Sequence, residues 1–193
     1  MKELLKKLSE AFAGESQARN RYSFYAKVAK KEGFEQIASI FLLTAENEKQ
    51  HAKWFFRMAN EVRDKLGEET PVELSTGVCL SSGDTLANLK AAIAGEHHEH
   101  DDMYPAIAIM AEELGFADMA KRIRAIAKAE LHHEERFKKL LANVESEKVF
   151  SKEEKTYWLC RECGYIHEGN EAPDKCPSCD HPKAYFEVQE EEY

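Results

Sequence analysis

The chain has 193 residues, of which 43% are hydrophobic and 33% are charged, and its formal net charge is -9. The hydrophobic fraction is sufficient for a buried core, and the length suits one medium-sized domain with a small second one. The negative charge argues against nucleic acid and anionic membrane surfaces as partners, because both bind basic protein surfaces. No segment approaches the ~20 apolar residues of a membrane span, and the N-terminus has no signal-peptide pattern, so a cytoplasmic protein is expected.

Two long helices are predicted at the start of the chain. The first covers about residues 2–31 and ends at Gly33, and the second follows almost at once and continues to about Leu66. Residues 67–83 are predicted as a non-helical connection, because Pro71 and several glycines and serines interrupt any helical pattern. A short turn thus joins the first two helices, and a long connection follows them.

A third and a fourth helix come after this connection. Asp84 is a suitable N-cap for the third helix, which is predicted to continue to Leu114 with a kink at Pro105. Gly115 allows a tight turn into the fourth helix, which is expected to end near residue 148. The expected apolar seam of the third helix consists of Leu86, Leu89, Ile93, Glu96, Met103, Ile107, Met110 and Leu114.

The lengths of the connections restrict the topology. The short breaks at Gly33 and Gly115 require antiparallel neighbours, so the first helix pairs with the second and the third with the fourth. The middle connection of about 17 residues spans ~55 Å when extended, which exceeds the ~48 Å length of a helix of about 32 residues. Residues 1–148 are therefore predicted to form an all-α four-helix bundle of the ferritin-like type with one long crossover. The same connection also permits the third and fourth helices to pack on a partner chain.

Charged residues occupy positions in the apolar seams of all four predicted helices. They are Glu15 in the first helix, Glu48 and His51 in the second, Glu96 in the third, and Glu130 and His133 in the fourth. A buried charge is costly unless it is paired or bound to a metal. One Glu from each of two helices, with a Glu-x-x-His pair from each of the other two, is the ligand set of ferritin-like di-iron and di-manganese proteins.

We therefore predict a carboxylate-bridged dinuclear site with two iron ions. Carboxylates neutralise and bridge divalent or trivalent cations, and one imidazole for each metal adds a ligand suited to iron. A single Glu-x-x-His motif is ordinarily a solvated or internally paired couple, but that explanation does not account for matching pairs in two seams. The ligands leave the metal open, since manganese and mixed iron–zinc also suit them.

Four of the five cysteines form two Cys-x-x-Cys pairs near the C-terminus: Cys160, Cys163, Cys176 and Cys179. This arrangement is typical of a metal site in a reducing compartment, and it offers four thiolates to iron or zinc. The surrounding aromatic residues resemble the small core of a rubredoxin; they are Tyr157, Trp158, Tyr165 and Phe186. Residues 149–193 are therefore predicted as a linker plus a rubredoxin-like domain with one iron ion, and a structural zinc site is the alternative.

Smaller features of the tail and the crossover carry further expectations. Gly164 is expected to allow a turn that directs backbone amides at sulfur, and His181 either hydrogen-bonds a thiolate or lies on the surface. The charged residues 146–156 are expected to let the tail move or reach a partner subunit. Cys79, which lies alone in the crossover, is expected to be an incidental free thiol.

Residues 13–19, 94–105 and 129–137, which contain predicted ligands from three helices, resemble the rubrerythrin family. The similarity extends over essentially the whole chain, including the cysteine-rich tail. It implies that Glu99 is a seventh metal ligand, although the residue pattern by itself favours a rim charge that faces water. It also implies that one iron ion is held by Glu99 when oxidised and moves toward His51 when reduced.

The same resemblance gives two tyrosines a role. Tyr22 and Tyr104 lie next to the predicted ligands in the seams of the first and third helices. Core aromatic residues with satisfied hydroxyls are the ordinary explanation, whereas the family resemblance implies hydrogen bonds to the ligands or to bound peroxide. The expected catalytic group is therefore Glu99, His51, Tyr22 and Tyr104.

Three further histidines surround Glu99, namely His97, His98 and His100. Extra imidazoles near a metal site offer a place for an adventitious ion, but a solvated cluster is the expected arrangement.

The resemblance implies a non-haem peroxidase that reduces hydrogen peroxide to water in oxidative-stress defence. Electrons would pass from a reduced pyridine nucleotide, through a separate reductase or rubredoxin, to the tail iron and then to the di-iron site. A head-to-tail homodimer is also implied, with the tail of one chain near the di-iron site of the other.

Two alternatives stay open from the sequence. One is a ferroxidase or iron-handling protein, although the fused electron-transfer module argues against it because iron storage needs no return of electrons. The other is a non-enzymatic interaction protein stabilised by metal, with zinc in the tail.

Overall fold

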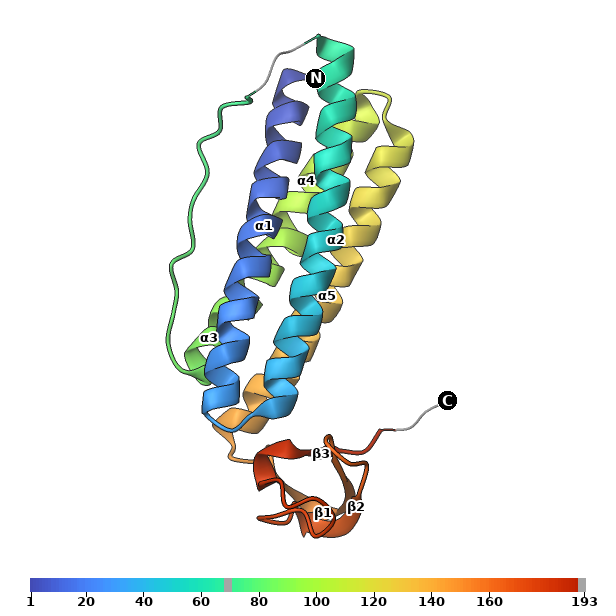
Figure 1. The fold of residues 1–193 in the computed structure, drawn as a ribbon. Helices are drawn as coiled ribbons and strands as arrows, with labels where there is room; N and C mark the ends of the chain where they lie inside the picture. Colours follow the sequence, from blue (N-terminus) through green and yellow to red (C-terminus); the bar gives the residue numbers. More distant parts are fainter. Residues whose placement is uncertain (68–70, 191–193) are drawn as a thin grey trace.

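The helices assemble as four antiparallel rods, the third of which is interrupted (Figure 1). The computed structural model describes residues 1–67 and 71–190. Its helices are α1 (Lys2–Lys31), α2 (Glu35–Leu66), α3 (Thr85–His97), α4 (Tyr104–Glu113) and α5 (Ala117–Glu145), with the π-helical segment η1 (His98–Met103) between α3 and α4. The predicted four-helix bundle is confirmed. Residues 68–70 of the predicted connection and 191–193 of the predicted tail domain lie outside the described residues.

Tight turns join α1 to α2 and α4 to α5. Gly33 and Gly115 have φ angles of 83° and 84°, in the left-handed region where a β-carbon is strained. Because the turns leave no room for a longer path, each pair of helices packs antiparallel, as predicted. Among residues 1–67 and 71–190, no helix is both long and apolar enough to cross a membrane.

The long connection runs back along α1 and starts α3 beside the end of that helix (Figure 1). The Tyr25 hydroxyl donates to the carbonyl of Ser81 at 2.7 Å, and the Thr85 N–H donates to the Glu32 carboxylate at 2.9 Å. Asp84 caps α3 as predicted, because its carboxylate accepts from the N–H of Ala87 at 2.8 Å. A single chain therefore assembles all four rods.

The third rod differs from the prediction of one helix kinked at Pro105. Pro105 lies in the first turn of α4, where its missing N–H leaves no broken bond, and the irregularity comes just before it, in η1. A π turn holds about one residue more than an α turn, so it shifts every later side chain around the helix. Leu114, which was expected in the seam, lies just past the end of α4 and is 40% exposed.

The insertion is visible in the spacing of matching residues. Tyr22 comes seven positions after Glu15 on α1, whereas Tyr104 comes eight positions after Glu96 on the third rod. All four side chains are nevertheless buried in the bundle. The extra residue in η1 therefore keeps Tyr104 on the interior face.

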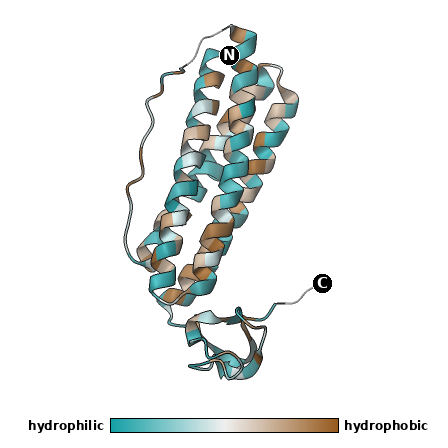
Figure 2. Ribbon diagram, viewed as in Figure 1, coloured by the Kyte–Doolittle hydropathy of each residue, from teal (hydrophilic) through white to brown (hydrophobic). Residues whose placement is uncertain are grey.

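Two apolar clusters lie on either side of the charged seam positions. One, toward the N-terminal end of α1, is built around Leu8, Phe55, Ile107 and Ile123. The other, toward the C-terminal end of α1, is built around Phe41, Leu89, Phe137 and Leu140. Figure 2 shows apolar and polar residues alternating along the helices, as expected for rods with one buried face. The polar centre thus lies between two apolar layers. Burial of each large side chain in these layers contributes about 1.5–3 kcal/mol to the stability of the fold.

The tail forms a small sheet with strand order β2-β1-β3, from β1 (Ser151–Cys160), β2 (Ile166–Glu171) and β3 (Phe186–Val188). The prediction of a separate small C-terminal domain is confirmed. The predicted flexible linker 146–156 is wrong in its second half, because residues from Ser151 onward belong to β1. The fourth helix also ends earlier than predicted, at Glu145. Phe150 stacks on Phe34 with ring centroids 6.2 Å apart, which seats the tail on the end of the bundle.

Candidate metal centres

The charged seam positions of the four rods meet in the middle of the bundle. They form two groups whose candidate ligand atoms lie within 4.8 Å of one another: Glu15, Glu48, His51 and Glu130 in one, and Glu48, Glu96, Glu130 and His133 in the other. Glu48 and Glu130 belong to both groups. The structure thus brings together all six charged seam residues that the sequence singled out.

Glu48 and Glu130 each present one carboxylate oxygen to each histidine. The Nδ1 atom of His51 lies 2.7 Å from Glu130 Oε1 and 3.0 Å from Glu48 Oε2. The Nδ1 atom of His133 lies 2.8 Å from Glu130 Oε2 and 3.2 Å from Glu48 Oε1. Two carboxylates that span two imidazoles in this way suit the bridging positions of a dinuclear site.

The other two glutamates each lie nearer one histidine. Glu15 Oε1 is 3.8 Å from His51 Nδ1, and Glu96 Oε2 is 3.5 Å from His133 Nδ1. The two imidazole rings are stacked with their centroids 5.9 Å apart. Each histidine therefore has two shared glutamates and one of its own, which gives two matching ligand sets.

A tyrosine from the neighbouring rod holds each of these unshared glutamates. The Tyr104 hydroxyl donates to Glu15 Oε1, and the Tyr22 hydroxyl donates to Glu96 Oε1, both at 2.5 Å. Burial, together with the nearby carboxylate charges, raises the pKa of both tyrosines well above the ordinary value, so they stay protonated donors. The predicted contacts between the tyrosines and the ligands are therefore present.

Several ligand atoms in this centre lack an aligned hydrogen-bond partner among the described residues. They are Glu15 Oε2, Glu48 Oε1, Glu96 Oε2, both carboxylate oxygens of Glu130, and Nδ1 of His133. The named oxygens of Glu48, Glu96 and Glu130 approach the two histidines closely, but without the alignment of a hydrogen bond. Four glutamates that are 0% exposed, and a fifth nearby, face only two imidazoles. A core holds this much negative charge only with cations or protons, so the donor set fits two metal ions.

The pKa values show which groups of the centre carry protons when no metal is bound. Burial, followed by the charge of Glu130, raises the pKa of Glu15 well above its usual range. Burial and the charge of Glu48 raise the pKa of Glu96 to about 8. Burial opposes a charged His51, but the adjacent Glu130 and Glu48 raise its pKa to about 9. Metal ions must displace these protons, so metal binding is coupled to proton release.

Glu99 is buried beside the centre but lies outside both ligand groups. Its Oε1 atom would lie 3.8 Å from a β-carbon placed on Gly14, so it faces α1 at a position without a side chain. Burial, then the charges of Glu96 and Glu130, raises the pKa of Glu99 well above the ordinary value. The residue is not the solvent-facing rim charge that its pattern favoured, and its role as a ligand stays a prediction.

Two polar residues near the centre were not predicted from the sequence. Arg136 donates to the hydroxyl of Thr44 at 2.6 Å, and burial lowers the pKa of this guanidinium while the charges of Glu96 and Glu48 oppose that shift. Glu134, next to a ligand, is 3% exposed. The hydroxyl of Thr44 in an otherwise apolar seam was a sequence signal for a polar partner such as Arg136. No sequence signal pointed to the burial of Glu134.

The three extra histidines do not form one solvated cluster. His98 is exposed and lies 3.3 Å from the Asp102 carboxylate. His97 and His100 instead face Glu134, on the other side of the rod. The expected exposure therefore holds for His98 and His97, but His100 is largely buried against Glu134.

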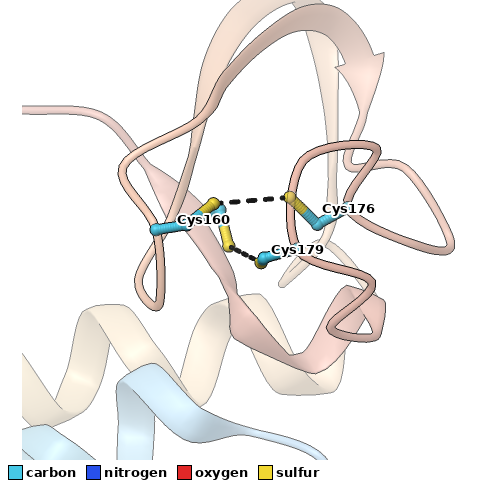
Figure 3. A group of neighbouring side chains, drawn as sticks. Cys160, Cys176 and Cys179 are labelled. Carbon is cyan, nitrogen blue, oxygen red and sulfur yellow. Dashed lines mark hydrogen bonds between the residues drawn. The ribbon is translucent and has the colours of Figure 1, made fainter.

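In the tail, the four cysteines form a second centre. Figure 3 shows Cys160, Cys176 and Cys179 directed toward one another from two loops. The Sγ atoms of Cys160 and Cys179 are 3.8 Å apart, those of Cys163 and Cys176 are 3.7 Å apart, and one group contains all four thiols. None of the four is in a disulfide, so all are available to bind a metal as thiolates.

The two Cys-x-x-Cys turns have the same backbone. The N–H of Gly164 donates to the Cys160 carbonyl at 2.9 Å, and the N–H of Asp180 donates to the Cys176 carbonyl at 3.0 Å. Gly164 has a φ of 76° and Asp180 a φ of 62°. Gly164 thus makes the predicted turn, and Asp180 makes the same turn without the freedom of glycine.

Backbone amides approach the sulfurs in both turns. The N–H of Tyr165 contributes most to lowering the pKa of Cys163 to about 6. The N–H of His181 reaches Cys179, whereas its ring lies against Tyr185 with centroids 4.5 Å apart. The main chain of His181, not its side chain, therefore provides the expected contact with sulfur. Cys79 is exposed and belongs to neither centre.

Two family models match separate parts of the chain. The model described as rubrerythrin matches residues 6–141, and the model described as the rubredoxin-like domain of rubrerythrin matches residues 158–187. These ranges correspond to the helical bundle and to the cysteine-bearing tail.

Relatives of similar length match over nearly the whole chain. Rubrerythrin-1 of Clostridium acetobutylicum is 51% identical over 187 residues, which cover 96% of this chain and 94% of the relative. Rubrerythrin of Clostridium perfringens is 50% identical over 186 residues, with 96% and 94% covered. A solved structure of partially reduced nigerythrin matches with a TM-score of 0.62 and 33% identity, covering 96% of this chain and 86% of that one.

Proposed function

The chain belongs to the rubrerythrin family, and from this premise we propose that it reduces hydrogen peroxide to water with electrons that enter through its tail. The family is one of oxidoreductases that act in oxidative stress. Its two metal centres, a di-iron carboxylate site and a four-cysteine rubredoxin-like site, have their counterparts here in the clustered carboxylates and cysteines. The reaction itself, and the route of its electrons, are the proposal.

The observation that carries the proposal is the presence of both ligand sets in one chain. Reduction of one peroxide molecule consumes two electrons and two protons and yields two water molecules. When bound, an iron pair supplies two electrons at once, and a tetrathiolate iron returns them singly. A centre for storage alone has no use for the second set of ligands, whereas a reductase needs it in every turnover.

The protein's own groups would orient the ligands and handle protons. Tyr22 and Tyr104 stay protonated, and their hydroxyls fix the orientation of Glu96 and Glu15. Both rings are sealed from solvent, at 1% and 0% exposure, so water does not compete for these hydrogen bonds. Two donors on neighbouring rods suit a substrate with two oxygen atoms.

Glu99 and His51 are proposed as alternative ligands of one metal. His51 belongs to the same group as Glu15, and the pKa of Glu15 is raised in part by the charge of Glu99. Gly14 lies beside the Glu99 carboxylate, whose Oε1 atom would be 3.8 Å from a β-carbon at that position. Glu99 is a buried carboxylate next to the centre that belongs to neither group. It is therefore placed to replace the imidazole of His51 as a ligand of that metal.

We also propose a head-to-tail homodimer in the cytoplasm, with a separate reductase linked to a reduced pyridine nucleotide or a rubredoxin as the electron donor. The tail packs at Phe34, about 14 residues before Glu48 on α2, which is ~21 Å along the helix. A second copy arranged head to tail would bring another tail closer to the middle of the bundle. Free thiols in the tail suit a reducing compartment.

Anaerobic reduction of the iron-loaded protein, followed by rapid mixing with peroxide or with oxygen, tests the proposal. We expect peroxide to reoxidise the bundle site much faster than oxygen does. Faster reaction with oxygen would favour a ferroxidase and contradict a peroxidase. Glu130→Ala should abolish peroxide reduction while the visible spectrum of the tail iron is unchanged, and full activity in this variant would also contradict the proposal.

A further inference from the structure

A third cluster of metal-binding side chains lies beside the bundle centre and shares no residue with it. His100 Nε2 is 2.6 Å from Glu134 Oε2, and His97 Nδ1 is 3.3 Å from Glu134 Oε1. The two imidazole rings are 5.2 Å apart and nearly perpendicular. One candidate ligand atom from each of the three residues lies within 4.8 Å of the other two.

Burial sets this cluster apart from ordinary surface histidines. Glu134 is 3% exposed and the side chain of His100 is 13% exposed, whereas the side chain of His97 is 54% exposed. Glu134 and His100 thus form the buried side of the cluster, and His97 lies on the side that is open to water. His98 offers an internal comparison, because its side chain is 66% exposed and its acidic neighbour, Asp102, is 70% exposed.

We propose that His97, His100 and Glu134 bind a divalent transition-metal ion of the zinc type, with water as the remaining ligand. Two imidazoles and one carboxylate form a common three-residue ligand set for zinc, and sites of this kind keep an open position for water. Imidazole also selects zinc and its neighbours over magnesium and calcium, which prefer oxygen ligands.

One cation already contacts the carboxylate. Lys138 Nζ lies 2.7 Å from Glu134 Oε1, and its side chain is 56% exposed. A metal ion would replace this ammonium as the neutralising charge, and the lysine is free to move into solvent. The Glu134–His100 contact uses the other carboxylate oxygen, so each oxygen of Glu134 is directed at one of the two histidines.

The position of the cluster gives the ion a structural consequence. His97 and His100 lie two residues before and one residue after Glu99, and Glu134 directly follows His133. A bound ion would therefore tie the start of η1 to α5 by a link that runs outside the di-iron centre. This link would hold the segment that carries Glu99, whose exchange with His51 is part of the proposed function.

Zinc binding to the iron-loaded, full-length protein tests the site directly. Equilibrium dialysis against Zn²⁺, followed by metal analysis, should give one zinc ion per chain with the iron content and the visible spectrum unchanged. His97→Asn should weaken zinc binding more than about 10-fold, since even residues that only orient ligands cost about 10- to 100-fold in metal affinity. His98→Asn is the matched control and should bind zinc as the unchanged protein does.

Thermal unfolding gives a second measurement on the same samples. Zinc should raise the unfolding midpoint of the unchanged protein and of His98→Asn, but not that of His97→Asn, because a ligand that binds only the folded state stabilises it. Absence of zinc in the iron-loaded protein, zinc found only where iron has been lost, or equal binding in the two variants would each overturn the proposal. None of these results depends on peroxidase activity, so the site and the proposed function fail separately.

Discussion

The bundle and the tail both gather metal ligands, but they do so in opposite ways. The bundle centre draws residues from Glu15 to His133, on four rods, and has an apolar layer on each side. The tail centre draws on two short turns, and two of its ligands, Cys160 and Cys176, are themselves part of the small tail core. In the bundle, the packing of the helices positions the metal ligands. In the tail, the metal ligands themselves form much of the core that stabilises the fold.

The largest expected effect that separates the two regions is removal of metal from the tail. Cys176→Ser should unfold the tail, because structural tetrahedral sites of this kind supply about 10–16 kcal/mol in small domains. The tail resonances in an NMR spectrum should collapse while the helical signal of the bundle persists. Glu130→Ala is the matched change in the bundle and should leave both regions folded. A tail that stays folded in Cys176→Ser would contradict the proposed difference between the tail and the bundle.

The next effect is the pH dependence of the metal-free bundle. The pKa of His51 is about 9, above its ordinary value of 6.5, and that of Glu96 is about 8, above 4.5. Both groups bind protons more tightly in the folded state, so their stabilisation is present at low pH and lost as pH rises through these values. Glu48 behaves oppositely: although burial opposes it, His133 and His51 lower its pKa to about 2, so its contribution is lost only in acid.

The metal-free bundle should therefore be less stable to urea at about pH 8.5 than at about pH 6, measured by circular dichroism. Metal reverses the trend, because metal binding releases the same protons and strengthens as pH rises. An equal or higher urea midpoint at the higher pH in the metal-free protein would contradict this account.

A smaller effect is expected from the tyrosine hydroxyls. Tyr22→Phe removes the donor to Glu96 and should cost about 1.5–3 kcal/mol, the usual range for a hydrogen bond to a charged group. Tyr104→Phe removes the donor to Glu15 and should cost a similar amount. Urea unfolding of the iron-loaded variants measures both. A large loss in one with none in the other would mean that the two halves of the centre are not equivalent.

The smallest effect concerns the second cysteine turn. Asp180 has a φ of 62°, a region that costs most non-glycine residues about 1–2 kcal/mol. Asp180→Gly relieves this strain but adds about 0.5–1 kcal/mol of unfolded-state entropy, so a gain below about 1 kcal/mol is expected. The rate at which the tail releases its metal to a chelator measures this gain, and the variant should release the metal more slowly. The salt bridge to Lys175 is exposed and should contribute little. Faster release would show that the turn is not strained.

The sequence predicted most of the bundle centre because its ligands obey the period of an α-helix. Glu48, His51, Glu130 and His133 stand at seam positions, and so the fold brought them together as expected. The π turn was missed, since an extra residue in one turn leaves the same composition and only shifts the later side chains. Pro105 appeared to mark a kink, but the irregularity lay before it.

Other features depended on neighbours that a local pattern does not contain. Residues 151–156 were expected to be a linker because they are mostly charged, yet they belong to β1, in which Ser151 and Thr156 pair with β2. Glu134 stands off the predicted seam, where a charge ordinarily faces water, and its burial comes from the rod that carries His97 and His100. In both places tertiary contacts, not local preference, determined the structure.

The one-residue insertion in η1 breaks what would otherwise be a two-fold symmetry of the protein's interior. The half formed by α1 and α2 and the half formed by the third rod and α5 have the same glutamate, tyrosine and Glu-x-x-His. Three residues after Glu15 comes Ala18, whereas three residues after Glu96 comes Glu99, and both are buried. The two metal positions are thus chemically distinguishable from within, so two identical ions bound there would have different surroundings and different potentials.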